Sequence, residues 1–319
     1  MITRDVQVAA AALRSGGLVA IPTETVYGLA ADATNANALA RLYAVKGRPL
    51  DHPSIIHLAD LESVQVGWVG NWPATADLLA RAFWPGPLTL ILSAGDRPDP
   101  AALGGTGTVA VRVPDSRIAR ELIELAGTGV AAPSANRFGR VSPTTAQHVL
   151  DDLGEDVDVI LDAGPCPVGV ESTIVDLTGW APRILRPGAI TAAMLEQALG
   201  QKLAQSIEGA PRAPGTLAAH YSPRTPLRLV ADITSALADQ STTIALIAPD
   251  AGHLQGGQPG HVVAVLDAGP DAATYAERLY ALLRAADNCG AEKIVAVAPA
   301  AGGLGDAVRD RLNRAAVGG

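Results

Sequence analysis

Short apolar runs bounded by glycine, proline or polar residues recur along the first two thirds of the chain. Runs of this kind are typical of buried strands, whereas apolar residues at helical spacing predict amphipathic helices. The predicted strands cover 17–21, 54–58, 88–92, 108–113, 129–132, 158–162, 171–177 and 183–186. The predicted helices cover 6–14, 36–45, 72–82, 116–125, 144–150 and 191–199. This pattern indicates an α/β domain over residues 1–203.

The pattern changes at residues 204–226, which contain four prolines and little periodicity and are therefore expected to form an extended connector. Strands are then predicted at 227–230, 243–247, 262–266 and 293–297, with helices at 272–287 and 306–314. Strands that alternate with helices favour a small parallel, Rossmann-like domain over residues 227–319. Its glycines at 301–305 lack the spacing of a dinucleotide-binding loop, so a plain strand-to-helix turn is expected there.

Polar residues crowd the positions where predicted strands end. The strand at 17–21 stops at a proline and is followed by Thr23, Glu24 and Thr25, and the strand at 129–132 is followed by residues 133–136, which read PSAN. Open α/β sheets bind their ligands beyond the carboxyl ends of strands. The helix at 36–45 delivers residues 46–48, which read KGR, and two cations around a glycine are suited to clamp a phosphate.

Composition and charge narrow the possible functions. Hydrophobic residues make up 48% of the 319 residues and net charge is −8. Lys and Arg number 15 against 21 Asp and Glu over residues 1–203, and 9 against 11 over the remainder, which disfavours a dominant nucleic-acid surface. The two cysteines lie far apart, so neither a disulfide framework nor a zinc site is expected. The first helix lacks the features of a signal peptide and no apolar run is long enough to span a membrane, so a cytoplasmic protein is expected.

Five short motifs together resemble the threonylcarbamoyl-AMP synthase family, whose YrdC-like proteins start synthesis of the tRNA base t6A. They are PTETVYGL (22–29), KGR (46–48), PSAN (133–136), EST (171–173) and LRPG (185–188). The resemblance covers about residues 8–200. PGTLAAHYSP (214–223) is similar to the connector of the two-domain members. The fold implied is a YrdC-like twisted open α/β sheet domain followed by a Rossmann-like parallel α/β domain.

The resemblance implies a nucleotidyltransferase that converts ATP, L-threonine and bicarbonate into L-threonylcarbamoyl-AMP and pyrophosphate. Mg²⁺ is expected to bind together with ATP, and whether it uses a protein ligand stays open. The product is expected to pass to a tRNA threonylcarbamoyltransferase complex. Direct tRNA contact stays open. The L-threonine site is expected at Thr25, His57, Arg112, Ala132 and Ser172. The ATP site is expected at Lys46, Arg48, His52, Thr108, Ser134, Asn136, Ser142, Arg186 and Tyr221, of which Lys46 and Arg48 are the catalytic candidates.

For several of these residues a purely structural role is an alternative to binding or catalysis. His57 lies in an apolar strand and is alternatively a satisfied core histidine. Arg112, whose fork suits a carboxylate, is alternatively a structural ion-pair partner of Asp115 or Glu121. Glu24 is a candidate base, magnesium ligand or turn cap. Ser172 alternatively does no more than begin its strand.

His52 and the pair His220–Tyr221 are unusual residues for the places they occupy. His52 occupies the place of an asparagine usual in the family, although an imidazole can still donate a hydrogen bond to ATP. His220 and Tyr221 are unusual in a passive connector, so the connector is either a lid over the catalytic cleft or an ordered linker between domains.

Two rival functions remain. A YrdC-like module that binds RNA without catalysis is disfavoured by the acidic charge of both parts of the chain. The carbamoyltransferase of hydrogenase maturation also uses a YrdC-like domain, but it resembles a fusion with zinc-finger parts, and no CxxC occurs in this chain.

Overall fold

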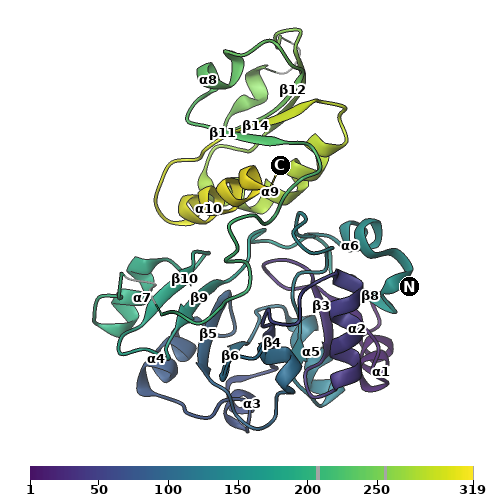
Figure 1. The fold of residues 1–319 in the computed structure, drawn as a ribbon, viewed down its shortest axis with the longest axis vertical. Coiled ribbons are helices and arrows are strands. Elements are labelled where there is room, and N and C mark those ends of the chain that lie inside the picture. Colours follow the sequence, from purple (N-terminus) through teal and green to yellow (C-terminus); the bar gives the residue numbers. More distant parts are fainter. Residues whose placement is uncertain (206–208, 255–256, 319) are drawn as a thin grey trace. The chain divides into compact units, whose positions relative to one another are not determined.

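The computed structural model describes residues 1–205, 209–254 and 257–318, and the chain divides into two compact units (Figure 1). The first unit comprises Met1–Phe138, Pro143–Pro167 and Glu171–Thr216. The second comprises Gly139–Ser142, Val168–Val170 and Leu217–Gly319. Residues of the predicted connector therefore occur in both units, and its residues 206–208 lie outside the described part of the chain.

The first unit contains a mixed sheet of ten strands in the order β1-β8-β2-β3-β7-β4-β6-β5-β9-β10. The strands are β1 (Ile2–Thr3), β2 (Val19–Ile21), β3 (Gly28–Asp32), β4 (Ile55–His57), β5 (Leu88–Ser93), β6 (Thr108–Arg112), β7 (Val130–Ala131), β8 (Val159–Leu161), β9 (Thr173–Asp176) and β10 (Arg183–Arg186). Parallel and antiparallel neighbours are mixed, so β4 runs parallel to β6 but antiparallel to β7. The eight strands predicted for this domain are all present.

In the part of the first unit that the structure describes, seven α-helices connect these strands. They are α1 (Val6–Arg14), α2 (Ala36–Lys46), α3 (Leu61–Gln65), α4 (Ala74–Phe83), α5 (Arg117–Ala126), α6 (Ala146–Leu153) and α7 (Ala192–Leu199), with short 3₁₀ turns η1 (Pro100–Leu103) and η2 (Gly154–Asp156). Capping side chains fix where several helices begin. The Asn35 side chain accepts the backbone N–H groups of two residues in the first turn of α2, which would otherwise be unsatisfied.

The alternation of side chains along the strands separates two cores. In β2, Ala20 belongs to the larger core, which α2, α4, α6 and α7 cover, whereas Val19 and Ile21 belong to a second core beneath α1 and α5. This second face continues along β4, β6, β5 and β9. There it carries the apolar patch of Ile55, Ile91, Ala110 and Ile174, on which Ala213 of the connector and the partly buried Leu185 pack.

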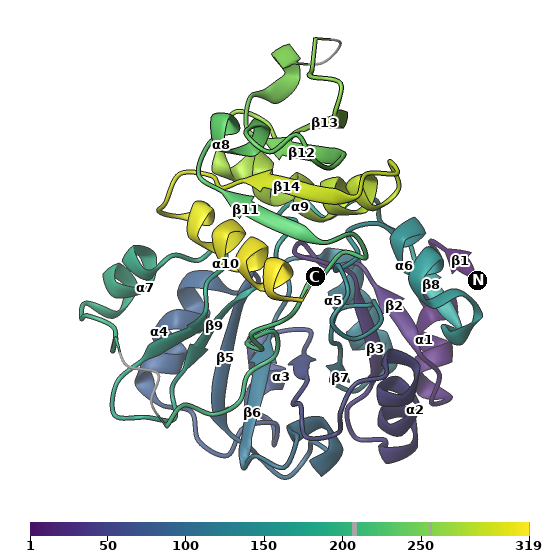
Figure 2. The ribbon, with the colours of Figure 1, turned by 45° about the horizontal axis from the view of Figure 1, so that its top comes forward.

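The second unit is the predicted parallel α/β domain. Its strands are β11 (Leu227–Val230), β12 (Ile244–Ala248), β13 (Val262–Asp267) and β14 (Lys293–Val297). They run parallel in the order β11-β14-β12-β13 (Figure 2). Its helices are α8 (Ile233–Leu237), α9 (Ala272–Asp287) and α10 (Leu304–Val317), with a 3₁₀ turn η3 (Ala251–Leu254).

The glycine-rich loop before α10 forms a hydrogen bond with a side chain in the first turn of that helix. The backbone N–H of Gly302 donates to Asp306 Oδ1 at 2.8 Å, so this N–H group already has a partner within the protein. This supports the prediction of a plain turn. Within the described residues, no helix is long and apolar enough to cross a membrane.

Candidate functional site

The loop that follows β2 is built around the hydroxyl of Thr23. Thr23 Oγ1 accepts the backbone N–H groups of Thr25 and Val26, both at 3.2 Å, and donates to the Val26 carbonyl at 2.6 Å. The Thr25 hydroxyl lies 2.9 Å from the Thr23 hydroxyl. These bonds close a tight turn that holds Glu24 and Thr25 in fixed, buried positions.

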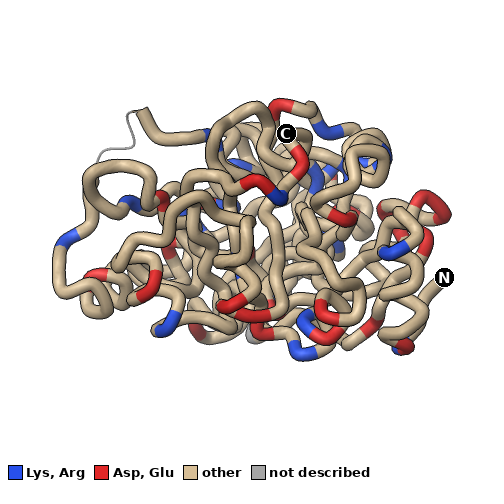
Figure 3. Tube along the Cα trace, turned by 90° about the horizontal axis from the view of Figure 1, so that it is seen from below, with Lys and Arg blue, Asp and Glu red and all other residues tan. Residues whose placement is uncertain are grey.

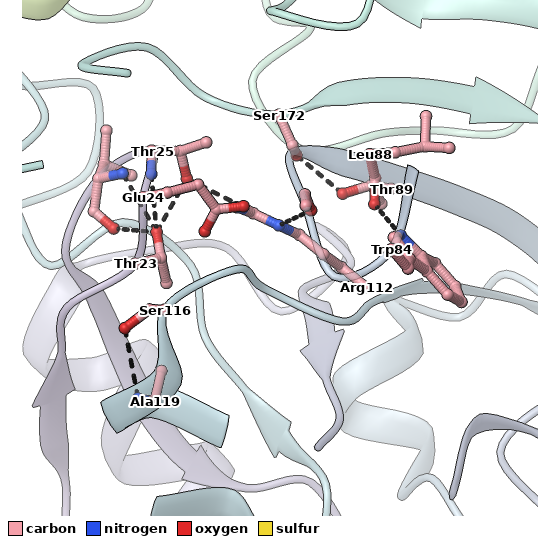
Figure 4. A network of polar contacts seen from close by, with 12 residues as sticks. Thr23, Glu24, Thr25, Trp84, Leu88, Thr89, Arg112, Ser116, Ala119 and Ser172 are labelled. Atoms are coloured by element: carbon pink, nitrogen blue, oxygen red, sulfur yellow. Dashed lines mark hydrogen bonds and ion pairs between the residues drawn. The ribbon is translucent and has the colours of Figure 1, made fainter. Parts of the chain in front are cut away.

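Arg112 ends β6 and lies against this loop (Figure 4). Its Nη1 donates to Thr25 Oγ1 at 2.9 Å and its Nε donates to the Gly86 carbonyl at 3.2 Å. Its Nη2 lies 2.7 Å from Glu24 Oε1, and both side chains are buried. Among the described residues, the ion-pair partner of Arg112 is therefore Glu24, and neither Asp115 nor Glu121 takes that part.

His57 is the cross-strand neighbour of Arg112 in the β4–β6 ladder. It is buried, and its Nδ1 lies 3.3 Å from the Ile55 carbonyl. Burial, and next the positive charge of Arg112, lower the pKa of His57 to about 3. The imidazole is therefore neutral near pH 7, with an arginine beside it.

Ser172 is held by residues from two other parts of the chain. Its hydroxyl lies 2.8 Å from that of Thr89, at the start of β5 (Figure 4). Arg186 donates to the Ser172 carbonyl through Nε at 3.1 Å and Nη2 at 3.0 Å, and its Nη1 donates to the Pro214 carbonyl at 3.0 Å. Thr89 was not predicted, although a threonine inside the apolar run of residues 88–92 is the signal that could have identified it.

Lys46 joins the KGR and PSAN motifs. Its Nζ donates to the carbonyl of Ser134 at 2.5 Å and to that of Asn136 at 2.6 Å, although these residues are 88 and 90 positions away. Burial, and next the nearby charge of Arg48, hold the pKa of Lys46 well below its usual value. The structure thus places the KGR and PSAN motifs in contact, which their positions in the sequence do not predict.

Arg48 and His52 meet at Phe138, which the sequence analysis did not single out. The Arg48 guanidinium lies 5.8 Å from the centre of the Phe138 ring, and its Nη2 donates to the Pro53 carbonyl at 2.7 Å. The His52 ring contacts the same ring edge-on at 5.4 Å. Burial and the charge of Arg48 lower the pKa of His52.

The remaining predicted residues lie in less distinctive surroundings. The Thr108 hydroxyl is 3.0 Å from that of Thr106, and Ala132 donates its backbone N–H to the Ile55 carbonyl at 2.9 Å. Ser142 and Tyr221 belong to the second unit and are grouped there with α9 and α10. In that unit the Tyr221 ring stacks on Tyr280 with centres 5.9 Å apart.

Comparison with known proteins identifies the family. A family model described as "Telomere recombination", which covers Sua5, YciO and YrdC proteins, matches residues 11–188. A second, described as "Threonylcarbamoyl-AMP synthase, C-terminal domain", matches residues 190–317. The chain belongs to the threonylcarbamoyl-AMP synthase family. The two matches meet near residue 189 of the chain.

Individual members of the threonylcarbamoyl-AMP synthase family are similar over most of the chain. The threonylcarbamoyl-AMP synthase of Pyrococcus abyssi is 37% identical and is aligned over 97% of this chain and 93% of its own length. That of Bacillus subtilis is 43% identical over 71% of this chain and 67% of its own. The structure described as "Crystal structure of P. abyssi Sua5 complexed with L-threonine" superposes with a TM-score of 0.89 at 35% identity, covering 100% of this chain and 97% of that one.

Membership of the threonylcarbamoyl-AMP synthase family favours the catalytic interpretation over an RNA-binding module. The distribution of charge agrees with this, because Lys and Arg are interspersed with Asp and Glu along the trace (Figure 3). An electrostatic nucleic-acid surface depends on clustered positive charge.

Proposed function

We propose that this chain is a nucleotidyltransferase that makes L-threonylcarbamoyl-AMP and pyrophosphate from L-threonine, bicarbonate and ATP. The observation that carries the proposal is the junction of Lys46 with the carbonyls of Ser134 and Asn136. Burial and Arg48 lower the pKa of Lys46, whereas the two carbonyls and a phosphate anion beside Nζ would favour its charged ammonium form. An ammonium group held by carbonyl dipoles keeps its charge, so its field would be available to that phosphate. Arg48 adds a second buried cation a few residues away.

The chemistry suits a site that positions and neutralises anions. The carbamate formed from threonine attacks the α-phosphorus of ATP, a bond forms between carbamate oxygen and phosphorus, and pyrophosphate leaves with the electron pair of the broken bond. We assign the triphosphate to Lys46, Arg48 and Arg186. The other proposed ATP contacts are His52, Thr108, Ser134, Asn136, Ser142 and Tyr221.

The amino-acid substrate is assigned to the groups around Arg112. The guanidinium would bind the threonine carboxylate, while Thr25, His57, Ala132 and Ser172 would surround its side chain. The neutral imidazole of His57 can pair with a hydroxyl, and buried polar groups that pair only with a hydroxylated substrate disfavour analogues without one. This would select threonine over an isosteric apolar amino acid.

Mg²⁺ bound with ATP would supply charge neutralisation at the phosphates. The described residues include no group of three or more His, Cys, Asp or Glu that could hold a metal ion. Phosphate oxygens and water would supply most of the ligands of such an ion, because Mg²⁺ usually keeps several waters and binds substrate phosphates. We further propose that the reaction takes place in the cytoplasm and that the product passes to a tRNA threonylcarbamoyltransferase complex.

Residues 209–216, which we call the strap, are proposed to cover the substrates. Ala213 packs on the apolar patch of the sheet, Arg186 donates to the Pro214 carbonyl, and Arg212 forms an ion pair with Asp51. A cover over the substrates would exclude water, which hydrolyses a carbamoyl–phosphate anhydride.

The function is tested by measuring pyrophosphate release from ATP with L-threonine and bicarbonate each omitted in turn. Release is expected only when both are present. Lys46→Ala should lower kcat/KM about 10²- to 10³-fold, because one preorganised charge at a phosphate is lost. Lys202→Ala, at an exposed lysine paired with Glu196, is the matched control and should leave the rate unchanged. Pyrophosphate release without threonine would contradict the proposal.

A further inference from the structure

Glu24 carries a buried carboxylate whose hydrogen-bonding capacity is unused. Its side chain is only 8% exposed, and one oxygen lies 2.7 Å from Arg112 Nη2. That contact is close but not aligned as a hydrogen bond, and neither carboxylate oxygen accepts a hydrogen bond from the described residues. A buried carboxylate without hydrogen-bond donors is costly, so this arrangement favours a ligand that brings donors with it.

Arg112 and Glu24 together match the two charged ends of an α-amino acid. Arg112 already donates to Thr25 and to the Gly86 carbonyl, which fixes its orientation, and its terminal nitrogens still retain N–H groups for a carboxylate. Glu24, 2.7 Å away, offers two acceptors to an ammonium group. Since the ammonium and carboxylate of an amino acid are attached to one carbon, an adjacent Arg–Glu pair can bind both at once.

A divalent cation suits the same carboxylate less well. The guanidinium at 2.7 Å would repel it, and the described residues supply no cluster of further acidic or imidazole ligands around Glu24. Mg²⁺ prefers near-octahedral oxygen ligands. An ammonium group needs only acceptors, and here it arrives with its own carboxylate to pair with Arg112.

We propose that Glu24 binds the α-ammonium of the amino-acid substrate and accepts the proton that this nitrogen must lose before it reacts. The inference rests on the proposed function and adds a residue to its chemistry. An ammonium, a bicarbonate and the Glu24 carboxylate give a carbamate, one water and the Glu24 carboxylic acid. The nitrogen–carbon bond forms, a carbon–oxygen bond of bicarbonate breaks, and the leaving oxygen departs as water with the second nitrogen proton.

The other titratable groups near Glu24 are poor acceptors of that proton. The pKa of His57 is lowered to about 3 by burial and by Arg112. Burial, and next the charge of Glu24, raise the pKa of the Cys166 thiol, which keeps it protonated. The Arg112 guanidinium carries only hydrogen-bond donors and has no acceptor atom for a proton. Of the described side chains around the loop after β2, Glu24 is the one that combines the proximity and the chemistry of a base.

The test compares wild type with Glu24→Gln across about pH 7 to 9, the range over which an α-ammonium begins to lose its proton in water. Glutamine keeps the size of the side chain but cannot take up the proton. At the lower end kcat/KM for L-threonine should fall about 10²- to 10⁴-fold. The loss should shrink nearly tenfold per pH unit, because only threonine already deprotonated in solution can react.

Two further variants and a comparison of three ligands separate this role from a structural one. Glu62→Gln, at an exposed glutamate of α3, should behave as wild type, and Glu24→Asp should recover part of the lost rate. Direct binding of ATP should be unchanged in Glu24→Gln. Wild type should bind L-threonine far more tightly than 3-hydroxybutanoate, which lacks the amine, and Glu24→Gln should bind the two more equally.

The outcomes distinguish a failure of the proposed function from a failure of the role of Glu24. If wild type shows no threonine-dependent pyrophosphate release, the proposed function fails. If wild type is active and Glu24→Gln keeps its rate, its pH profile and its discrimination against 3-hydroxybutanoate, the role of Glu24 is overturned. Equal weakening of ATP and threonine binding in a variant that unfolds at lower temperature would also overturn it, because that result indicates a structural role.

Discussion

His57 has a buried imidazole whose folded pKa of about 3 lies far below the value of about 6.5 for an unfolded chain. Between these values the unfolded state binds more protons, so the free energy of unfolding rises with pH and is lost as pH falls from 6.5 towards 3. His57→Gln removes this contribution. The variant's loss of stability on acidification should be shallower than that of wild type by up to about 1.4 kcal/mol per pH unit.

Urea unfolding between about pH 4.5 and 7 measures this difference in slope. His261→Gln, which removes an imidazole from the second unit, controls for the loss of a histidine as such. Parallel stability profiles for wild type and His57→Gln would contradict the burial of a neutral His57.

At the residue scale the sequence identified the kinds of side chain but not their partners. Lys46 and Arg112 are basic residues at the ends of a predicted helix and strand, which is enough to suspect a site. Their partners are the carbonyls of Ser134 and Asn136 and the carboxylate of Glu24, all distant in the chain. Such pairings depend on strand order, which no local spacing encodes.

Gly188 packs closely against the backbone on either side of Ser172, one of the proposed threonine-binding residues. It follows β10, and a Cβ placed there would lie 2.5 Å from the backbone nitrogen of Thr173 and 2.7 Å from the Glu171 carbonyl. Because these atoms are backbone, they cannot move without shifting the intervening Ser172. Gly188→Ala should therefore destabilise the protein by about 1–3 kcal/mol and lower kcat/KM for threonine.

Gly179→Ala is the matched control on the turn between β9 and β10. Its Cβ would meet its nearest atom at 3.6 Å, an ordinary contact, and its backbone is exposed. Thermal unfolding and pyrophosphate release of both variants check the prediction. A Gly188→Ala protein as stable and active as Gly179→Ala would refute the close packing at this position.

At the scale of helices and strands, the accuracy of the predicted bounds depends on how clear the apolar pattern of each element is. Strands with continuous apolar runs, such as β5, were predicted within a residue of their observed ends. β3 was not predicted, because its residues GLAAD are small and carry little strand propensity. The helices predicted to begin at Ser116 and Thr191 begin one residue later, since these two residues are N-caps.

At the scale of the whole molecule, the sequence predicted the order and type of the two domains. It could not predict that residues 139–142 and 168–170 group with the second unit. Contacts such as that of the Ser222 backbone N–H with the Gly139 carbonyl, at 2.8 Å, join segments about 80 residues apart. Only the packed tertiary structure determines them.

Tyr221 is predicted to contribute strongly to the stability of the second unit. It is 1% exposed, its ring stacks on Tyr280, and the buried Arg311 guanidinium lies 5.4 Å from its ring centre. Its φ of 62° is uncommon for a residue with a side chain, so strong packing must hold it there. Tyr221→Ala should cost about 3–5 kcal/mol, as for other buried aromatic residues.

Tyr221→Phe separates this packing role from the predicted contact with ATP. Phenylalanine keeps the ring that Tyr280 and Arg311 contact but lacks the hydroxyl, so it should retain most of the stability. Leu217→Ala, at a partly exposed side chain of the same segment, should change stability little. Urea unfolding and direct ATP binding decide between the roles. If Tyr221→Ala unfolds like wild type while ATP binding weakens, the side chain acts on the nucleotide, and packing in the second unit does not explain its burial.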